Sequence, residues 1–251
     1  MNFMQTLLLG TISGLTIFLG LPIARLKPEA EKYLAFMNAL AIGILFFLFF
    51  DVMKNASGPI EDALRAHSAN VWLLLTAMIG GFGVGLLSLV YYGKRFLAKG
   101  GIPPQKLALL IAIGIGLHNF SEGLAIGNSA HTGEIHLALL LIIGFGLHNV
   151  TEAFGIAGPL ASQKVRWTYL ALLGLIAGGP NFLGTIIGFS FISEPITILF
   201  LSLAGGAIMY VIGELLASGR KIGFHEWSGW GLTVGFFVGL LTDYILVAVG
   251  A

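Results

Sequence analysis

Eight long apolar segments, separated by short polar connections, constrain this chain more than any other feature of its sequence. A helix that crosses a bilayer needs about 20 consecutive and mainly apolar residues. Charges, prolines and glycines divide the chain into segments of this length at 3–24, 33–53, 70–92, 107–130, 137–160, 168–192, 195–217 and 228–249. We therefore predict an all-α membrane protein with eight transmembrane helices. Because all the connections are short, we expect a single transmembrane domain over residues 1–251.

Composition supports this class and excludes several functions. Only 10% of the residues are charged, far below the roughly 25% that is usual in soluble domains. The net charge is +1 and the basic residues are scattered among short connections, so the chain offers no surface for nucleic acid. It has no cysteine, which excludes disulfides and leaves nitrogen and oxygen atoms to hold any metal ion. We expect no bound cofactor.

The basic residues also predict the orientation in the membrane. Eleven of the 13 Lys and Arg residues follow the first, third, fifth and seventh segments, and only Lys54 and Arg65 lie elsewhere. Connections rich in Lys and Arg remain in the cytoplasm. We therefore expect a multi-pass protein of the cell (inner or plasma) membrane, surrounded by lipid, with both termini on the extracytoplasmic side.

The fourth and fifth segments carry two copies of one polar motif, His-Asn-Phe-Ser-Glu at 118–122 and His-Asn-Val-Thr-Glu at 148–152. Each copy follows a similar Gly-x-Gly-Leu sequence, which marks an internal repeat. On a helix, residues i and i+4 lie on one face, so each histidine stands over the glutamate of its own copy. Each copy therefore offers nitrogen, amide oxygen and carboxylate ligands within about one helical turn.

The two copies are placed to hold a metal ion in the middle of the membrane. His118 and Glu122 lie in a segment that runs antiparallel to the one with His148 and Glu152. An axis in the membrane plane relates such segments in inverted-repeat transporters, and both copies lie about halfway between flanking charges, near the bilayer midplane. A carboxylate at a helix centre costs roughly 2.5 to 3.5 kcal/mol even on a lenient scale. A bound divalent cation would offset this cost for both glutamates.

A structural interpretation competes with the metal site. Each histidine could hydrogen-bond the glutamate of its own copy as a buried pair, although repetition at equal depth favours the metal site. Asn119 and Asn149 could bridge neighbouring helices, or they could bind the ion or support its ligands.

Other polar residues in the apolar segments are weaker candidates. Glu214, near the cytoplasmic end of the seventh segment, could receive the ion on its way inward. Asn181 follows Pro180, which frees a backbone carbonyl, and its side-chain oxygen is a candidate ligand. Asp51 closes the second segment and Asp243 lies within the eighth. We expect an interfacial role for the first of these acids and a structural role for the second.

These residues resemble the ZIP (ZRT/IRT-like) family of divalent metal transporters, whose fourth and fifth helices carry His-Asn-x-x-Glu motifs along the metal path. The resemblance extends over the whole chain and includes eight spans, outward termini, a Gly-Gly-Pro turn in the sixth segment and Tyr-x-x-x-Glu in the seventh. It implies a 3+2+3 arrangement of helices with inverted repeats. The resemblance also implies that a homodimer is one candidate state of assembly.

The resemblance implies a centre for two metal ions, bridged by the two glutamates. The first site would use His118, Glu122, His148 and Glu152, and the second Asn119, Glu122, Asn149 and Glu152. Many relatives have an acid where Asn181 stands, so this chain lacks one negative charge at the second site. We therefore expect the second site to hold a water molecule or a less strongly bound ion.

We predict a transporter of divalent first-row cations, with Zn²⁺ as the first expectation. Imidazole and carboxylate ligands suit Zn²⁺, Fe²⁺, Mn²⁺ and Co²⁺, and Cd²⁺ could pass with them. The resemblance implies uptake into the cytoplasm, by alternating access around a midplane site. Two alternatives stay open, an intramembrane di-metal enzyme of the di-iron type and a sodium-coupled solute carrier. The Glu-x-x-His order typical of di-iron sites is absent, and Na⁺ prefers oxygen ligands to histidine.

Overall fold

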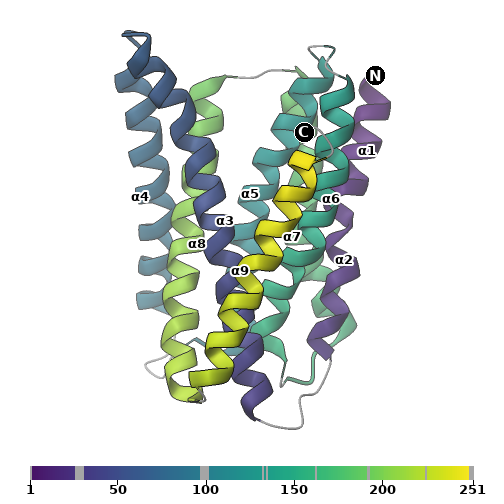
Figure 1. Ribbon diagram of the computed structural model, residues 1–251, viewed down its shortest axis with the longest axis vertical. Helices are drawn as coiled ribbons and strands as arrows, with labels where there is room; N and C mark the ends of the chain where they lie inside the picture. Colours follow the sequence, from purple (N-terminus) through teal and green to yellow (C-terminus); the bar gives the residue numbers. More distant parts are fainter. Residues whose placement is uncertain are drawn as a thin grey trace.

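The computed structural model describes residues 2–25, 31–96, 102–131, 133, 135–161, 163–190, 193–223 and 225–248. In this part the chain is almost entirely helical and has no strand, and the helices run up and down in one bundle (Figure 1). The elements are α1 (Phe3–Leu15), α2 (Ile17–Gly20), η1 (Leu21–Arg25), α3 (Glu31–Arg65), α4 (Val71–Phe96), α5 (Pro104–His131), α6 (Ile135–Ala157), η2 (Gly158–Leu160), α7 (Trp167–Ser190), α8 (Glu194–Ile222) and α9 (His225–Ala248). The predicted all-α class is confirmed.

Seven helical runs are long and apolar enough to cross a membrane, judged by length and composition over the described residues. The eighth, α9, has 24 residues but is not among these seven. Its packing nevertheless matches a crossing, because Gly231 of α9 contacts Phe36 of α3 and Gly239 contacts Phe47. The two helices therefore run parallel over more than two turns. Together these features describe a multi-pass membrane protein.

The helix α3 is longer than its apolar segment. We predicted a span over 33–53 that Asp51 closes, but the helix continues to Arg65, so the predicted end is wrong. The residues after 53 are more polar, and the helix continues through Pro59 with Ile60 and Ala63 buried. Arg65 adds ion pairs to Glu61 and Asp62 one turn earlier, at 3.6 and 3.4 Å. Hydropathy detects where apolar residues stop, which is not where the helix stops.

The first predicted span is broken at Thr16, where α1 ends and α2 begins. The Thr16 hydroxyl lies 2.6 Å from the carbonyl oxygens of Ser13 and of Gly146 in α6. Carbonyls in the last turn of a helix lack intrahelical partners. The Thr16 hydroxyl supplies a donor at the end of α1 and also joins this point of the chain to α6.

The Gly-Gly-Pro sequence of the sixth span forms no turn, so the expectation from the resemblance is wrong. The helix α7 continues through Pro180. Proline cannot donate to the carbonyl four residues earlier, and Gly116 of α5 packs directly against that carbonyl, which belongs to Ile176. The freed carbonyl thus lies in the contact between α5 and α7.

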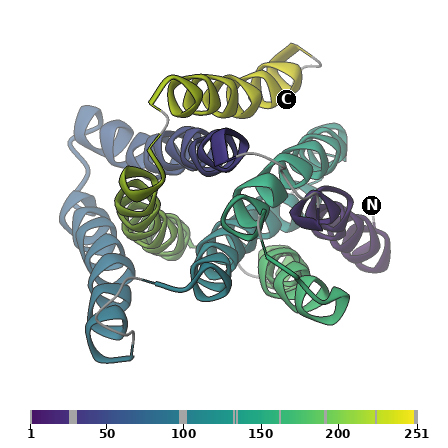
Figure 2. The same cartoon turned by 90° about the horizontal axis from the view of Figure 1, so that it is seen from below.

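The helices form two groups, which Figure 2 shows on opposite sides of the bundle. One group contains α1, α2, α5, α6 and α7, and the other contains α3, α4, α8 and α9; contacts of α5 with α8 and of α3 with α6 join them. The closest pair is α5 and α7, where a Cβ atom on Gly123 would collide with the Asn181 carbonyl and one on Gly184 with the Phe120 carbonyl. Small residues allow such close backbone contact between membrane helices.

The packing partners correspond in pairs. The helix α5 packs on α7 as α6 packs on α1 and α2, and α3 packs on α9 as α8 packs on α4. An axis that exchanges α5 with α6, and the first three crossings with the last three, would produce these pairs. The 3+2+3 inverted repeat requires that axis and stays a prediction, because packing partners alone do not establish the symmetry.

Aromatic and basic side chains gather at the end of the bundle that the sequence predicts to be cytoplasmic. Arg25 lies 4.8 Å from the ring centre of Trp167, and Lys32 lies 5.1 Å from that of Trp227. Such pairs are typical of the interface between a bilayer and water. Large apolar side chains such as Trp72, which is 78% exposed, cover the outside of the bundle, as expected for a surface in contact with lipid.

Candidate metal centre

The repeated motif forms a buried polar cluster between α5 and α6. The side chains of Asn119, Asn149 and Glu152 are fully buried, and those of His118 and Glu122 are 4% exposed. His118 lies halfway along α5, among residues of the apolar core. Because burial removes water, each charged or polar group here needs a partner.

His118 connects the two copies of the motif. Its Nε2 atom lies 3.3 Å from Oε1 of Glu122 and 3.6 Å from Oε1 of Glu152. The first distance follows from the i, i+4 spacing on α5. The second depends on the packing of α5 against α6, which brings Glu152 to the same imidazole nitrogen. One histidine thus stands between carboxylates from two helices.

The cluster has the chemistry of a site for a divalent cation. Two buried carboxylates carry more negative charge than one imidazole neutralises, and uncompensated buried charge is costly. Nitrogen and carboxylate oxygen are common zinc ligands. Among the described residues, His, Asp and Glu side chains do not by themselves complete a group of three metal ligands. His148 lies in α6 one turn before Glu152, as the repeat requires, but its side chain falls outside the described part of the structure.

The two asparagines form a hydrogen-bonded bridge between helices. The Asn119 amide donates to Oδ1 of Asn149 and, at 3.1 Å, to the Ala177 carbonyl of α7. The Asn149 amide donates to the Phe145 carbonyl at 2.8 Å and to the Ser13 carbonyl of α1 at 3.3 Å. This bridge joins α1, α5, α6 and α7 at the level of the cluster.

Hydrogen bonding leaves the two asparagines with different capacities to bind an ion. Asn149 uses both amide hydrogens and accepts one bond at its oxygen. Asn119 Oδ1 and Glu122 Oε2 are buried and have no hydrogen-bond partner among the described residues. A buried oxygen without a partner is costly unless a ligand satisfies it. Asn119 Oδ1 and Glu122 Oε2 are therefore buried oxygen atoms that a cation could satisfy.

The structure places Asn181 next to the bridge and not in the cluster. It is fully buried on α7, one turn after Ala177, and its side chain lies against Gly14 of α1. Its Oδ1 atom lies 3.4 Å from the Thr185 hydroxyl, and its amide nitrogen has no hydrogen-bond partner within the described part of the chain. Asn181 is thus available near the cluster, about one helical turn away.

The described structure shows no contact of the cluster with Glu214 or Asp243. Glu214 is half-buried on α8, and its described interactions are with Tyr210 one turn earlier. The backbone of Asp243 belongs to α9, but its side chain lies outside the described residues. Neither predicted role receives support from the geometry.

Asp51 is a neighbour of the cluster that the sequence reasoning missed. It interacts electrostatically with Glu122 and Glu152, and its Oδ1 accepts a 3.1 Å hydrogen bond from the amide of Asn55. The helix α3 extends well beyond Asp51, so the end of the apolar segment at this residue is not the end of the helix. The pair of Asp51 and Asn55 at i and i+4 was a signal for a continuing helix, although Gly58 and Pro59 argue against one in the sequence.

Comparison with known proteins agrees with this chemistry. The family model described as ZIP Zinc transporter matches residues 101–245, a region that contains both copies of the motif. The zinc transporter GufA of Myxococcus xanthus is 35% identical over 142 residues, which are 55% of this chain and 56% of GufA. The zinc transporter ZupT of Corynebacterium aurimucosum is 27% identical over 251 residues, covering 90% of this chain and 91% of ZupT. The matched region is thus just over half of GufA and nine-tenths of ZupT.

Proposed function

Because the chain belongs to the ZIP family, whose members are divalent metal transporters and not enzymes, we propose that it carries Zn²⁺ across the cell membrane into the cytoplasm. The two zinc transporters to which it is similar support zinc as the substrate. The predicted positive-inside orientation defines the two faces.

The position of His118 between Glu122 and Glu152 carries this proposal. Its Nε2 atom lies within 3.3 and 3.6 Å of carboxylates from two different helices, in the buried interior. An ion bound there would replace its water ligands by imidazole and carboxylate, which suit Zn²⁺ and, with less discrimination, Fe²⁺, Mn²⁺ and Co²⁺. The imidazole also argues against a sodium-coupled carrier, since sodium sites use oxygen ligands.

The residues of the centre have different roles in this proposal. His118, Glu122, His148 and Glu152 bind the transported ion, and Asn119 adds an oxygen to it. Asn149 holds the bridge to α1, and Asp51 supplies negative charge nearby. Asn181 on α7 and Glu214 on α8 are additional candidate ligands along the path of the ion.

Transport then proceeds by alternating access. The group of α1, α2, α5, α6 and α7 is held together by close glycine contacts and by the asparagine bridge. We propose that this group moves as a unit against α3, α4, α8 and α9, so that the site opens first to one side and then to the other. The moving unit is therefore larger than the central pair of spans that the 3+2+3 scheme suggests.

Uptake of radioactive zinc into vesicles reconstituted with the purified protein tests the proposal. Wild type should accumulate zinc, a variant with His118→Ala and His148→Ala should not, and Ser121→Ala should resemble wild type. Ser121 is the matched control because it neighbours Glu122 and its hydrogen bond within the described structure is to the Leu117 carbonyl of its own helix, at 3.5 Å. Equal accumulation by the double variant and wild type would refute transport through this cluster.

A further inference from the structure

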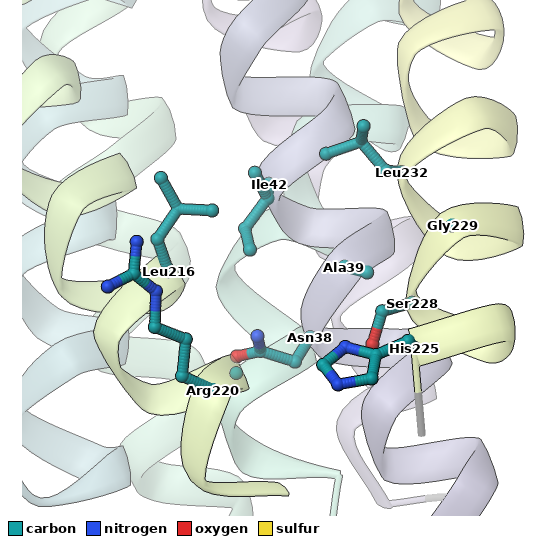
Figure 3. Close-up of a pocket in the computed structure, with 10 residues that line it drawn as sticks. Asn38, Ala39, Ile42, Leu216, Arg220, His225, Ser228, Gly229 and Leu232 are labelled. Atoms are coloured by element: carbon teal, nitrogen blue, oxygen red, sulfur yellow. The ribbon is translucent and has the colours of Figure 1, made fainter. Parts of the chain in front are cut away.

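A groove follows one side of the contact between α3 and α9. Its first part is a cavity of about 280 Å³ between α3, α8 and α9 (Figure 3), and its second part is a cavity of about 350 Å³ between α3 and α9. Leu232 lines both parts. On α3 the lining residues continue from Ala39 to Gly43, at i+4 spacing, so the two parts lie along one stripe of the helix.

The groove is polar at one end. Asn38, His225 and Ser228 lie at the lower end in Figure 3, where α8 turns into α9, and Ile42 and Leu232 lie above them; Arg220 lines the cavity from α8, and its side chain extends upward beside Leu216. Asn38 is 5% exposed and its amide donates to the Leu215 carbonyl at 3.2 Å. No acidic side chain lines this described cavity. The polar end therefore offers one permanent positive charge, an imidazole and a hydroxyl without a competing carboxylate.

The other part of the groove is apolar and of suitable length for a lipid chain. Phe46, Phe50, Phe236 and Phe237 line it. Asn38 and Phe50 are twelve residues apart on α3, which corresponds to about 18 Å along the helix. One leaflet of hydrocarbon is about 15 Å thick, half of a core of about 30 Å. The groove thus reaches from the predicted cytoplasmic interface through one leaflet.

We propose that this groove binds an anionic phospholipid of the cytoplasmic leaflet. The phosphate lies at Arg220, His225 and Ser228, and an acyl chain follows α3 and α9 past Phe46 and Phe236. Basic pockets between membrane helices on the cytoplasmic side bind anionic headgroups in this way. A zwitterionic lipid also has a phosphate, but its own cation would lie against Arg220, so charge complementarity selects the anionic class. The inference does not depend on metal transport.

Native mass spectrometry of the full chain, titrated with phosphatidylglycerol or with phosphatidylcholine of identical acyl chains, tests the proposal. Wild type should bind phosphatidylglycerol more tightly. Arg220→Ala should lower that affinity by about fivefold to tenfold, the contribution of one basic residue near the membrane surface, and should leave phosphatidylcholine unchanged. Lys94→Ala is the matched control, because Lys94 is an exposed basic residue at the same end but on α4. Equal affinities for both lipids, or an unchanged affinity in Arg220→Ala, would overturn the proposal.

A second variant tests the acyl part of the groove. Thr233 is exposed and lines the apolar cavity, so Thr233→Trp should fill the groove without disturbing the core and should weaken binding of both lipids. Glycerol phosphate, which has the headgroup chemistry without the chains, should bind far more weakly than phosphatidylglycerol. Glycerol phosphate binding as tightly as the lipid would show a simple anion site, and lipid release on dimer formation would show that a second copy covers the groove. Either result would refute the lipid groove.

Discussion

The two copies of the motif have the same spacing in the sequence but different surroundings in the fold. Asn119 on α5 keeps its side-chain oxygen open, whereas Asn149 on α6 uses its oxygen and both amide hydrogens. The difference comes from the bond between them, because the Asn119 amide donates to the Asn149 oxygen and no described group donates to the Asn119 oxygen. The repeat supplies equal side chains, and we expect their different hydrogen bonds to give them different parts in ion binding and in helix packing.

The largest effect should come from the residues in which the two copies are alike. Glu122→Gln and Glu152→Gln each remove one buried negative charge from the cluster, so each should lower zinc affinity by about 100-fold or more, beyond the effect of losing a supporting group. Competition with a fluorescent chelator in detergent measures this affinity, with Thr151→Ala as the control in α6. Wild-type affinity in either glutamate variant would contradict an ion shared by both helices.

The two asparagines should separate binding from stability. Asn119→Ala should lower zinc affinity by about tenfold, because it removes the open oxygen. Asn149→Ala should instead lower the unfolding free energy by about 1 to 3 kcal/mol, since it removes three hydrogen bonds and leaves the buried Asn119 amide without its acceptor on α6. Chelator competition and thermal unfolding in the same detergent measure both quantities. A greater loss of affinity in Asn149→Ala than in Asn119→Ala would break the comparison between the two copies.

Sequence reasoning succeeded where local geometry decides the outcome. The helical period fixes His118 over Glu122, and the apolar segments predict the crossings within a few residues at most ends. Sequence reasoning failed where contacts between helices determine the hydrogen bonds or the course of a helix. The contact of Asn149 with Ser13 depends on where α1 breaks, and α7 remains helical through Pro180 while its freed carbonyl lies against α5. Neither neighbour can be identified from one chain without its fold.

Asp51 lies outside both copies and should have an intermediate effect. Its charge acts through space on both glutamates, so Asp51→Asn should weaken zinc binding by about threefold to tenfold. Asp62→Asn provides the control, since Asp62 is 77% exposed near the end of the same helix. An equal effect in both variants would show a general charge effect and not a specific contribution of Asp51.

Asn181 should give the smallest effect on the first ion. It lies one turn from the asparagine bridge and outside the cluster, so Asn181→Asp should leave the affinity of the first ion nearly unchanged. The added carboxylate should increase the zinc bound per chain, measured by elemental analysis, because it restores the charge that the second site lacks. Unchanged stoichiometry would show that Asn181 does not face a second site.

The central claim is that imidazole and carboxylate groups from α5 and α6 bind one zinc ion together. X-ray absorption spectroscopy at the zinc edge, on purified wild type and on His118→Ala, tests this claim directly. The account predicts a wild-type shell of nitrogen and oxygen at about 2.0 to 2.2 Å with imidazole scattering, and one imidazole fewer in the variant. Identical spectra for the two proteins, or a wild-type shell without imidazole, would contradict it.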